Sequence, residues 1–178
     1  ILSRVDTFSS EVKNLLQSAS IMGMQFSSSI LKKLHEKLNS QIHIDESMEL
    51  FVLKDLVMEE TKDQFSFKSS IARDVIYEAV LKSNRQMLHF EIGNLIEENY
   101  NDSLDIFYYD LAEHFNRAEE FEKAVSYLEK SGEKARGLYD NKQAAEFYRQ
   151  LTEILKNPDY SKNIIDLEKN KWKVNSPN

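Results

Sequence analysis

The 178-residue sequence contains no cysteine, only four glycines and only two prolines. Without cysteine, a disulfide scaffold and a cysteine-based zinc site are both excluded, and the composition fits a reducing compartment. We therefore expect a cytoplasmic protein. Because glycine and proline are the residues that most often interrupt helices, their scarcity in a chain rich in Leu, Glu, Lys and Ala predicts a mainly α-helical fold.

Long apolar runs are also missing. No stretch approaches the roughly 20 apolar residues of a membrane-spanning helix, and the opening residues ILSRVDTFSS carry no signal-peptide pattern. The chain begins with Ile1 and not with Met, so we expect a piece of a longer protein. The formal net charge is −7, which disfavours non-specific binding to nucleic acid or to an anionic membrane. We expect neither of these partners.

Motifs of common catalytic chemistry are absent as well. The glycines are isolated, so there is no Gly-rich phosphate loop. The four histidines are scattered and lack the spacing of a metal site, and no nucleophile elbow is present. We therefore expect no catalytic, cofactor-binding or metal site in this chain. An enzyme in its own right is the least favoured class.

The first part of the chain is predicted to contain three helices. Apolar residues recur at helical spacing over residues 8–22 and again over about 30–38, where Ser27 to Ser29 offer a cap. A third helix is expected to begin at a cap on Asp45, and its apolar stripe extends to Val57.

A small β-hairpin is predicted next. Residues 57–60 and 64–68 flank a polar turn, and phenylalanines in the second segment alternate with polar residues, as in a half-buried strand. Three helices and one hairpin are the order of a winged-helix-like unit. Two further helices, over about 70–81 and 85–98, complete an expected first domain of residues 1–100.

The remainder predicts antiparallel helical hairpins similar to tetratricopeptide repeats. The segment NYNDS reads as a linker near residue 101, and small residues recur twelve positions apart at expected helix contacts: Ala112 with Ala124, and Gly132 with Ala144. We expect a second domain over 101–172 and a disordered tail over 173–178. Its helices are predicted at about 104–116, 120–137 and 140–156, with one more over 161–173.

A winged helix often reads DNA with its third helix, but the charge of this segment argues against that use. Residues 45–60 hold six acids and one base, a local charge of −5, which would repel phosphates. The alternative of a winged-helix DNA-binding transcription regulator with a helical sensor tail stays open. It would need a basic surface elsewhere, near Lys32, Lys33 and Lys37.

Three stretches carry a recognisable pattern: LLQSASIMGMQFSSSILKKL, LKDLVMEE and FSFKSSIARDVIYEAVLKSNRQMLH. The motif reads F-x-F-x-H, then R-[DE]-x-[VI]-Y, then R-x-x-L-H, and the matching residues are Phe65, Phe67, Arg73, Asp74, Ile76, Tyr77, Arg85, Leu88 and His89. This pattern resembles the region that follows the nucleotide-binding core of signal-transduction ATPases with numerous domains. The stretch LAEHFNRAEEFEKAVSYLEKSGEKA resembles the start of the helical repeats that follow in those proteins, so the resemblance covers about residues 1–156.

The resemblance implies a non-catalytic regulatory and protein-interaction module within a larger signalling ATPase. It implies ATP and Mg²⁺ in a core upstream of residue 1, and no cofactor in this part of the chain. The implied partners are that upstream core and a protein bound by the helical hairpins. The implied effector is a kinase or a class III nucleotidyl cyclase, as in cyclases similar to soluble adenylyl cyclase.

One position departs from the family pattern. Ser69 stands where the family often has a histidine, which in some members approaches the nucleotide phosphate. Ser69 can donate one hydrogen bond there or cap the following helix, and a serine at a helix start favours the cap.

Two groups of candidate site residues remain. Asp74, Tyr77, Arg85 and His89 are expected to form a structural staple, in which Asp74 or Glu78 pairs with Arg85 across the turn between two helices. Phe107, Tyr108 and Tyr109 are the candidate interaction surface, with neighbouring helices covering all three as the alternative.

Overall fold

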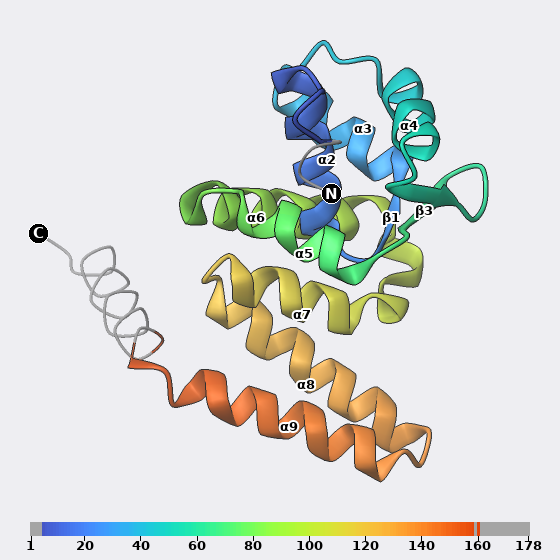
Figure 1. Ribbon diagram of the computed structural model, residues 1–178. Coiled ribbons are helices and arrows are strands. Elements are labelled where there is room, and N and C mark those ends of the chain that lie inside the picture. Colours follow the sequence, from blue (N-terminus) through green and yellow to red (C-terminus); the bar gives the residue numbers. More distant parts are fainter. Residues whose placement is uncertain (1–4, 159, 161–178) are drawn as a thin grey trace, which may run out of the picture. The chain divides into compact units, whose positions relative to one another are not determined.

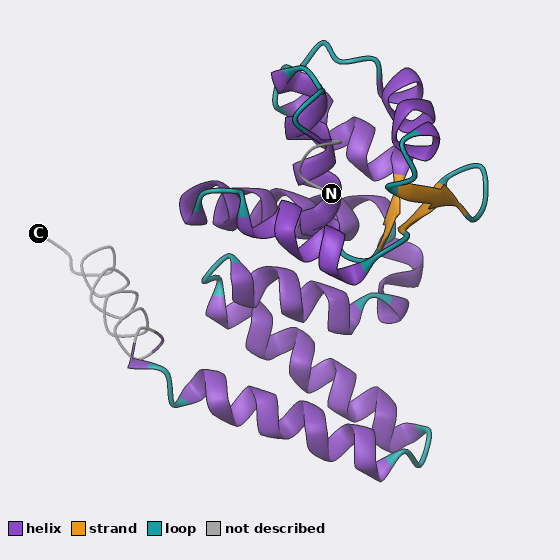
Figure 2. Cartoon of the chain, in the orientation of Figure 1, coloured by secondary structure: helices purple, strands orange, loops and turns teal. Residues whose placement is uncertain are grey.

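The computed structural model describes residues 5–158 and residue 160. The chain divides into two compact units, one ending at Asn101 and the other starting at Asp102. Helices dominate both units, which confirms the prediction of a mainly helical chain (Figures 1 and 2). The helix expected over 161–173 and the tail expected over 173–178 lie outside the described residues.

The first unit alternates helices with short strands. Its elements are α2 (Ser10–Met22), β1 (Gln25–Ser27), α3 (Ser28–Lys37), α4 (Ile44–Leu53), β2 (Val57–Glu59), β3 (Gln64–Phe67), α5 (Ser70–Glu78) and α6 (Lys82–Asn99). Helix α2 packs against α5 and α6, and α3 also packs against α6.

The strands of this unit form a three-stranded antiparallel sheet in the order β1-β3-β2. The sequence predicted only the hairpin of β2 and β3. The third strand, β1, pairs with the other edge of β3, with Phe26 opposite Phe65. Because β1 has only three residues, it is too short to show an alternating pattern in the sequence.

Helix α4 differs from its predicted bounds at both ends. It begins one residue before Asp45, and His43 precedes it without a side-chain cap. It ends at Leu53 because Asp55 adopts a positive φ of 59°, which turns the chain toward the sheet. Val57, expected on the helical stripe, instead opens β2 and pairs opposite Phe67.

Several helices of the chain end in the same way, and without glycine. Among the described residues, the non-glycine residues with positive φ are Asn39, Asp55, Glu119 and Tyr139. In the helix that ends before Glu119, the Glu120 N–H donates to the carbonyl oxygen of Phe115, and the Glu119 N–H donates to that of Asn116. This is the Schellman arrangement, which usually places glycine at the left-handed position. All four sites share this pair of bonds.

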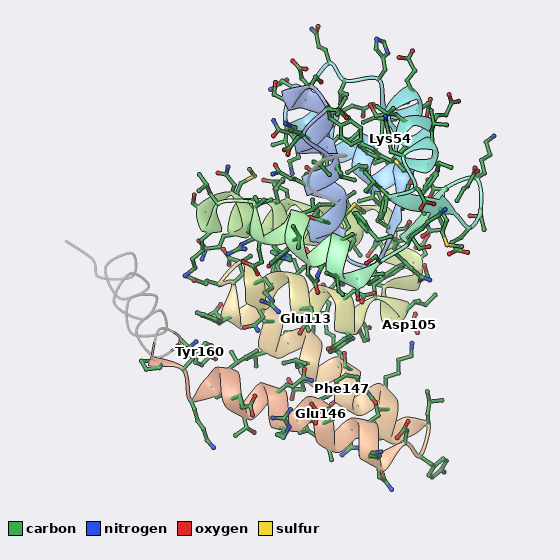
Figure 3. The ribbon with its side chains drawn as sticks, viewed as in Figure 1. Lys54, Asp105, Glu113, Glu146, Phe147 and Tyr160 are labelled. Carbon is green, nitrogen blue, oxygen red and sulfur yellow. The ribbon has the colours of Figure 1, made fainter. Side chains whose placement is uncertain are left out.

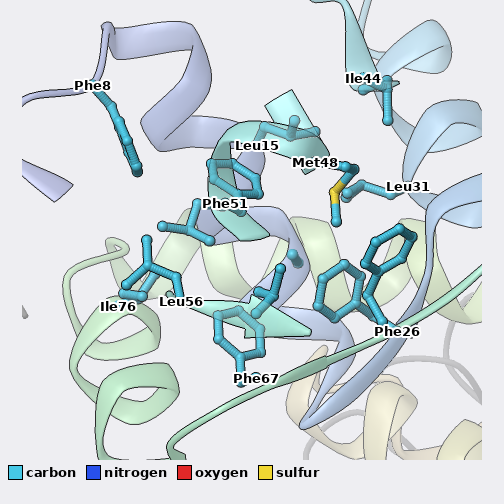
Figure 4. Close-up of a cluster of buried hydrophobic side chains, with 14 residues drawn as sticks. Phe8, Leu15, Phe26, Leu31, Ile44, Met48, Phe51, Leu56, Phe67 and Ile76 are labelled. Atoms are coloured by element: carbon cyan, nitrogen blue, oxygen red, sulfur yellow. The ribbon is translucent and has the colours of Figure 1, made fainter. Parts of the chain in front are cut away.

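The core of the first unit lies where the helices cover the sheet. Phe51 of α4 is fully buried and lies against Phe8, with 5.6 Å between ring centroids. Phe26 of β1 packs between its sheet neighbours, 6.0 Å from Phe65 and 5.4 Å from Phe67. Figure 4 labels the rings of Phe8, Phe26, Phe51 and Phe67 in this cluster, together with aliphatic side chains from α2, α3 and α4. Burial of this cluster holds the short strands in place.

The loop between β2 and β3 is tied to the start of α3 by one carboxylate. Asp63 accepts hydrogen bonds from the Ser27 and Ser28 hydroxyls at 2.8 and 3.0 Å, and from the Ser29 backbone N–H at 2.7 Å. Burial alone would raise the pKa of Asp63, but the hydrogen bonds from these three serines outweigh it, and the pKa lies below its ordinary value of 3.8. The charged carboxylate therefore joins the hairpin to the helix.

The second unit consists of helical segments joined by short turns. They are the kinked 3-10 segment η1 (Asn101–Ile106), α7 (Tyr108–Arg117), α8 (Phe121–Gly137) and α9 (Asn141–Leu155). Most of the expected linker NYNDS is thus helical, and the helix expected from residue 104 begins at Tyr108. Helix α8 packs against both α7 and α9. None of the described helices is long and apolar enough to cross a lipid bilayer.

Gly132 of α8 lies against Tyr148 of α9. A Cβ atom at this position would lie 2.8 Å from Cζ of Tyr148. We predict that Gly132→Ala lowers the free energy of unfolding by up to about 2 kcal/mol, because displacing the Tyr148 ring costs about 1 to 3 kcal/mol and the helix regains about 1 kcal/mol from alanine.

Urea denaturation followed by circular dichroism measures this effect. Gly137→Ala is the matched control, since a Cβ there meets no atom within 4 Å, and alanine should stabilise the helix by up to about 1 kcal/mol. Equal effects of the two substitutions would contradict the packing described here.

The Asp63 contacts predict a pH-dependent stability. Because the folded pKa of Asp63 is lower than the unfolded pKa, its contribution is complete above the unfolded value and disappears as the pH falls through the folded value. We expect Asp63→Asn to lower the free energy of unfolding at pH 7, and to lower it clearly less at a pH near 2. Urea titrations at both pH values test this, with the exposed Asp102→Asn as control. A loss that is the same at both pH values would show that the ionised carboxylate is not responsible.

Candidate functional site

Tyr77 is the centre of the first predicted cluster. It lies on α5, and its hydroxyl is 3.1 Å from Nε2 of His89 on α6, so the two groups share a hydrogen bond. Their rings meet edge to face, with 5.9 Å between centroids. The guanidinium groups of Arg73 and Arg85 both lie over the Tyr77 ring, at 4.8 and 4.9 Å from its centroid. Tyr77 is thus held by two cation–π contacts and one hydrogen bond.

The two arginines of this cluster form ion pairs with different acidic residues. Of the two candidates for Arg85, it is Glu78 that forms the ion pair, at 2.5 Å. Asp74 instead pairs with its neighbour Arg73 at 3.0 Å. The structure therefore brings Tyr77, Arg85 and His89 together and places Asp74 one contact away.

Arg73 is the member of this cluster that the sequence analysis did not include. Its Nε donates to the carbonyl oxygen of Ser20 on α2, at 2.7 Å. The signal was present, because Arg73 and Tyr77 are four residues apart on one helix face. Arg73 extends the cluster from α5 and α6 to a third helix. The contacts of Arg73 with Ser20, of Tyr77 with His89 and of Arg85 with Glu78 and Tyr77 join helices, so the cluster has a structural role.

Ser69 lies at the start of α5. Its hydroxyl oxygen accepts a hydrogen bond from the Ala72 backbone N–H at 3.2 Å. The structure confirms the expected cap.

The aromatic residues 107–109 do not share one environment. Phe107 precedes α7 as its N-cap residue. The Tyr108 ring lies 5.9 Å from that of Tyr127 on α8, whereas the Tyr109 ring lies 5.4 Å from that of Phe147 on α9. The two tyrosines thus contact different helices. Tyr109 remains 41% exposed, so it is the tyrosine of this group that is most available to a partner.

Acidic side chains surround Tyr109. Figure 3 shows Glu113 on α7, and Glu146 beside Phe147 on α9. Burial raises the pKa of Tyr109, and the negative charge of Glu113 raises it further. Glu146 itself accepts hydrogen bonds from Arg149 and Gln150, which lower its pKa to about 2. This surface of the second unit is therefore charged and negative around a neutral tyrosine.

Two lysines of the region expected to supply a basic surface have partners on α6. Lys37 forms an ion pair with Glu91 at 2.5 Å, and that hydrogen bond raises the pKa of Lys37. Lys33 donates to the side chain of Asn99. In contrast, α4 presents Asp45, Glu46 and Glu49 as exposed side chains. The exposed face of α4 is therefore acidic.

Metal ligation has no geometric basis in the part of the chain that the structure describes. Within it, no group of three or more His, Asp or Glu side chains is arranged to hold a metal ion. His35, for example, is buried between helices, with Nε2 3.1 Å from the Ser18 hydroxyl. Burial lowers its pKa.

Comparison with known proteins gave no assignment. No protein-family model matches the chain, and neither the curated proteins nor the solved structures contain a match. The case for a function therefore depends on the residues and geometry given above.

The contacts of Tyr77 predict separable contributions to stability. Tyr77→Phe removes the hydrogen bond to His89 and keeps the ring beneath both guanidinium groups, so we expect a loss of about 1 kcal/mol in the free energy of unfolding. Tyr77→Leu removes the ring contacts too and should cost more. Urea denaturation of the wild type and both variants tests this order. If the two variants are equally destabilised, the cation–π contacts contribute nothing.

Proposed function

We propose that this chain is a non-catalytic regulatory and protein-interaction module of a larger multidomain signalling ATPase. In this proposal the first unit is a winged-helix-like joint that docks on an ATPase core lying upstream in the parent chain. The second unit is a set of tetratricopeptide-like hairpins that contacts a protein partner. The module relays the nucleotide state of the core to an effector such as a nucleotidyl cyclase or a kinase.

The element order of the first unit supports a winged helix. Helix α2, strand β1, helices α3 and α4, and the β2–β3 hairpin follow one another in the winged-helix sequence. The three-stranded sheet β1-β3-β2 is also the sheet expected of that fold. The tie between Asp63 and the start of α3 fixes the hairpin to the helical part.

The charge of α4 is the observation that carries the proposal. In this order of elements α4 would be the helix that enters a DNA groove, yet Asp45, Glu46 and Glu49 are exposed on it and it contains no Lys or Arg. A DNA-binding face needs cations that displace the counterions of the phosphates. An acidic helix on a winged-helix framework favours a protein-facing joint, and a DNA-binding regulator remains the alternative.

The close packing of the second unit supports tetratricopeptide-like hairpins. Ala112 and Ala124 are almost fully buried, and Gly132 lies directly against the Tyr148 ring. Small residues at these positions let neighbouring helices approach closely. Stacked helix pairs of this kind present extended surfaces to other proteins.

The upstream core is proposed from the resemblance of residues 65–89 to signal-transduction ATPases with numerous domains. Ser69, at the position of the nucleotide-contacting histidine in that family, uses its hydroxyl oxygen to cap α5. We therefore assign no nucleotide contact to Ser69, and the proposal places ATP and Mg²⁺ binding entirely in the upstream core. Arg73, Tyr77, Arg85 and His89 then act to hold α5 and α6 as one body that transmits movement.

Isothermal titration calorimetry with ATP and ADP tests this proposal. We expect no binding by the 178-residue chain and clear binding by a longer chain that includes the upstream sequence. Nucleotide binding by the 178-residue chain alone would overturn the relay function. If neither chain binds nucleotide but the 178-residue chain binds DNA in a salt-dependent way, the regulator alternative replaces it.

A further inference from the structure

An apolar groove with acidic edges lies between α4 and the β2–β3 hairpin. Its volume is about 440 Å³, within the range of sites that receive ligand side chains. One wall is α4, and the other is formed by Glu59, Lys62 and Phe65 of the hairpin. Phe65 is buried, so the sheet supplies an apolar floor.

The wall on α4 is a helical stripe that shares only the buried Met48 with the hydrophobic core. Asp45, Met48, Glu49, Val52 and Leu53 line the groove, and they recur at i, i+3, i+4, i+7 and i+8, which places them on one face. Phe51 and Ile44 point to the core instead.

Two apolar side chains of this stripe are exposed. Val52 is 39% exposed and Leu53 is 80% exposed. Exposed leucine and valine beside an apolar cavity are typical of surfaces that bind another protein. A helix laid in such a groove would cover both side chains.

The charge around the groove favours a positively charged ligand. Three carboxylates, those of Asp45, Glu49 and Glu59, line it together with one ammonium group, that of Lys62. The groove is therefore negative, and its negative charges border the exposed apolar side chains. A ligand complementary to it has apolar side chains on one face and lysine or arginine beside them.

We propose that this groove binds a basic amphipathic helix of a partner protein. The inference rests on the proposed interaction role and specifies one surface and the chemistry of its partner. Leu53 and Val52 contact the apolar face of the partner helix, and Asp45, Glu49 and Glu59 face its basic side chains. A second copy of this chain is a poor occupant, because its net charge of −7 would oppose approach to an acidic groove.

Fluorescence anisotropy with designed peptides tests the proposal. The probe is a labelled peptide of roughly 18 residues, long enough to form a helix, with leucine on one face and lysine on the other. Two control peptides are a scrambled version and a version with glutamate in place of lysine. We expect the 178-residue chain to bind the amphipathic basic peptide at least about tenfold more tightly than either control, since both the apolar face and the opposite charge contribute.

Matched variants locate the binding. Leu53→Ser should weaken binding of the basic peptide by roughly tenfold, as expected for one leucine contact. Leu138→Ser, which changes a leucine that is 72% exposed in the second unit, should leave it unchanged. Glu49→Gln should weaken binding several-fold and reduce its salt dependence, whereas Glu133→Gln should do neither.

Each contrary outcome has a definite meaning. Equal binding of the basic and scrambled peptides, or equal effects of Leu53→Ser and Leu138→Ser, would overturn the groove as a docking site. Concentration-dependent dimerisation that Leu53→Ser abolishes would also overturn it, in favour of self-association. These measurements contain no nucleotide, so failure of the groove is distinguishable from failure of the relay function, which the calorimetry alone decides.

Discussion

The stability of the first unit depends on helices that cover its small β-sheet. Its strands have three or four residues each, and so small a sheet is marginal in water without helices on one face. Phe26, Phe65 and Phe67 supply that face, and Phe51 of α4 lies in the same buried cluster. Asp63 secures the remaining free end, the hairpin turn, to α3. The position of α4 relative to the hairpin, and with it the groove between them, follows from these contacts.

Two faces of α4 have different roles: one packs in the core, and the other lines the groove. Its inner stripe is fixed by the core, so the residues there have little freedom to vary. The outer stripe from Asp45 to Leu53 shares only Met48 with the core, so its other residues can carry charge and exposed apolar groups without loss of core packing. Tyr77 serves packing alone in the contacts described, since its hydroxyl meets His89 and its ring lies beneath Arg73 and Arg85.

The sequence predicted secondary structure well where an apolar repeat extends over several helical turns. It predicted poorly where tertiary contacts determine the conformation. Residues 10–22 and 121–137 form helices close to the predicted ranges because their apolar repeats extend over several turns. Strand β1 was missed as part of the sheet because three residues carry no period, and its strand character comes from pairing with β3. The pairing of Arg85 with Glu78 and not with Asp74 depended on side-chain reach across a turn, which spacing alone leaves open. The groove combines residues from α3, α4 and the hairpin, so only the folded chain displays it.

The helix ends that adopt the Schellman arrangement lower the free energy of unfolding of this fold. Glu119 and Tyr139 occupy left-handed conformations that cost non-glycine residues roughly 1 to 2 kcal/mol relative to their preferred regions. Tyr139 is 90% exposed, so little packing offsets that strain. The second unit is therefore less stable than its backbone allows, and glycine at these turns would raise its stability while leaving the α4 groove and the Tyr77 cluster untouched. Because strain at these helix ends lowers the stability of the second unit, that unit tolerates fewer destabilising substitutions elsewhere than it would with glycine at the turns.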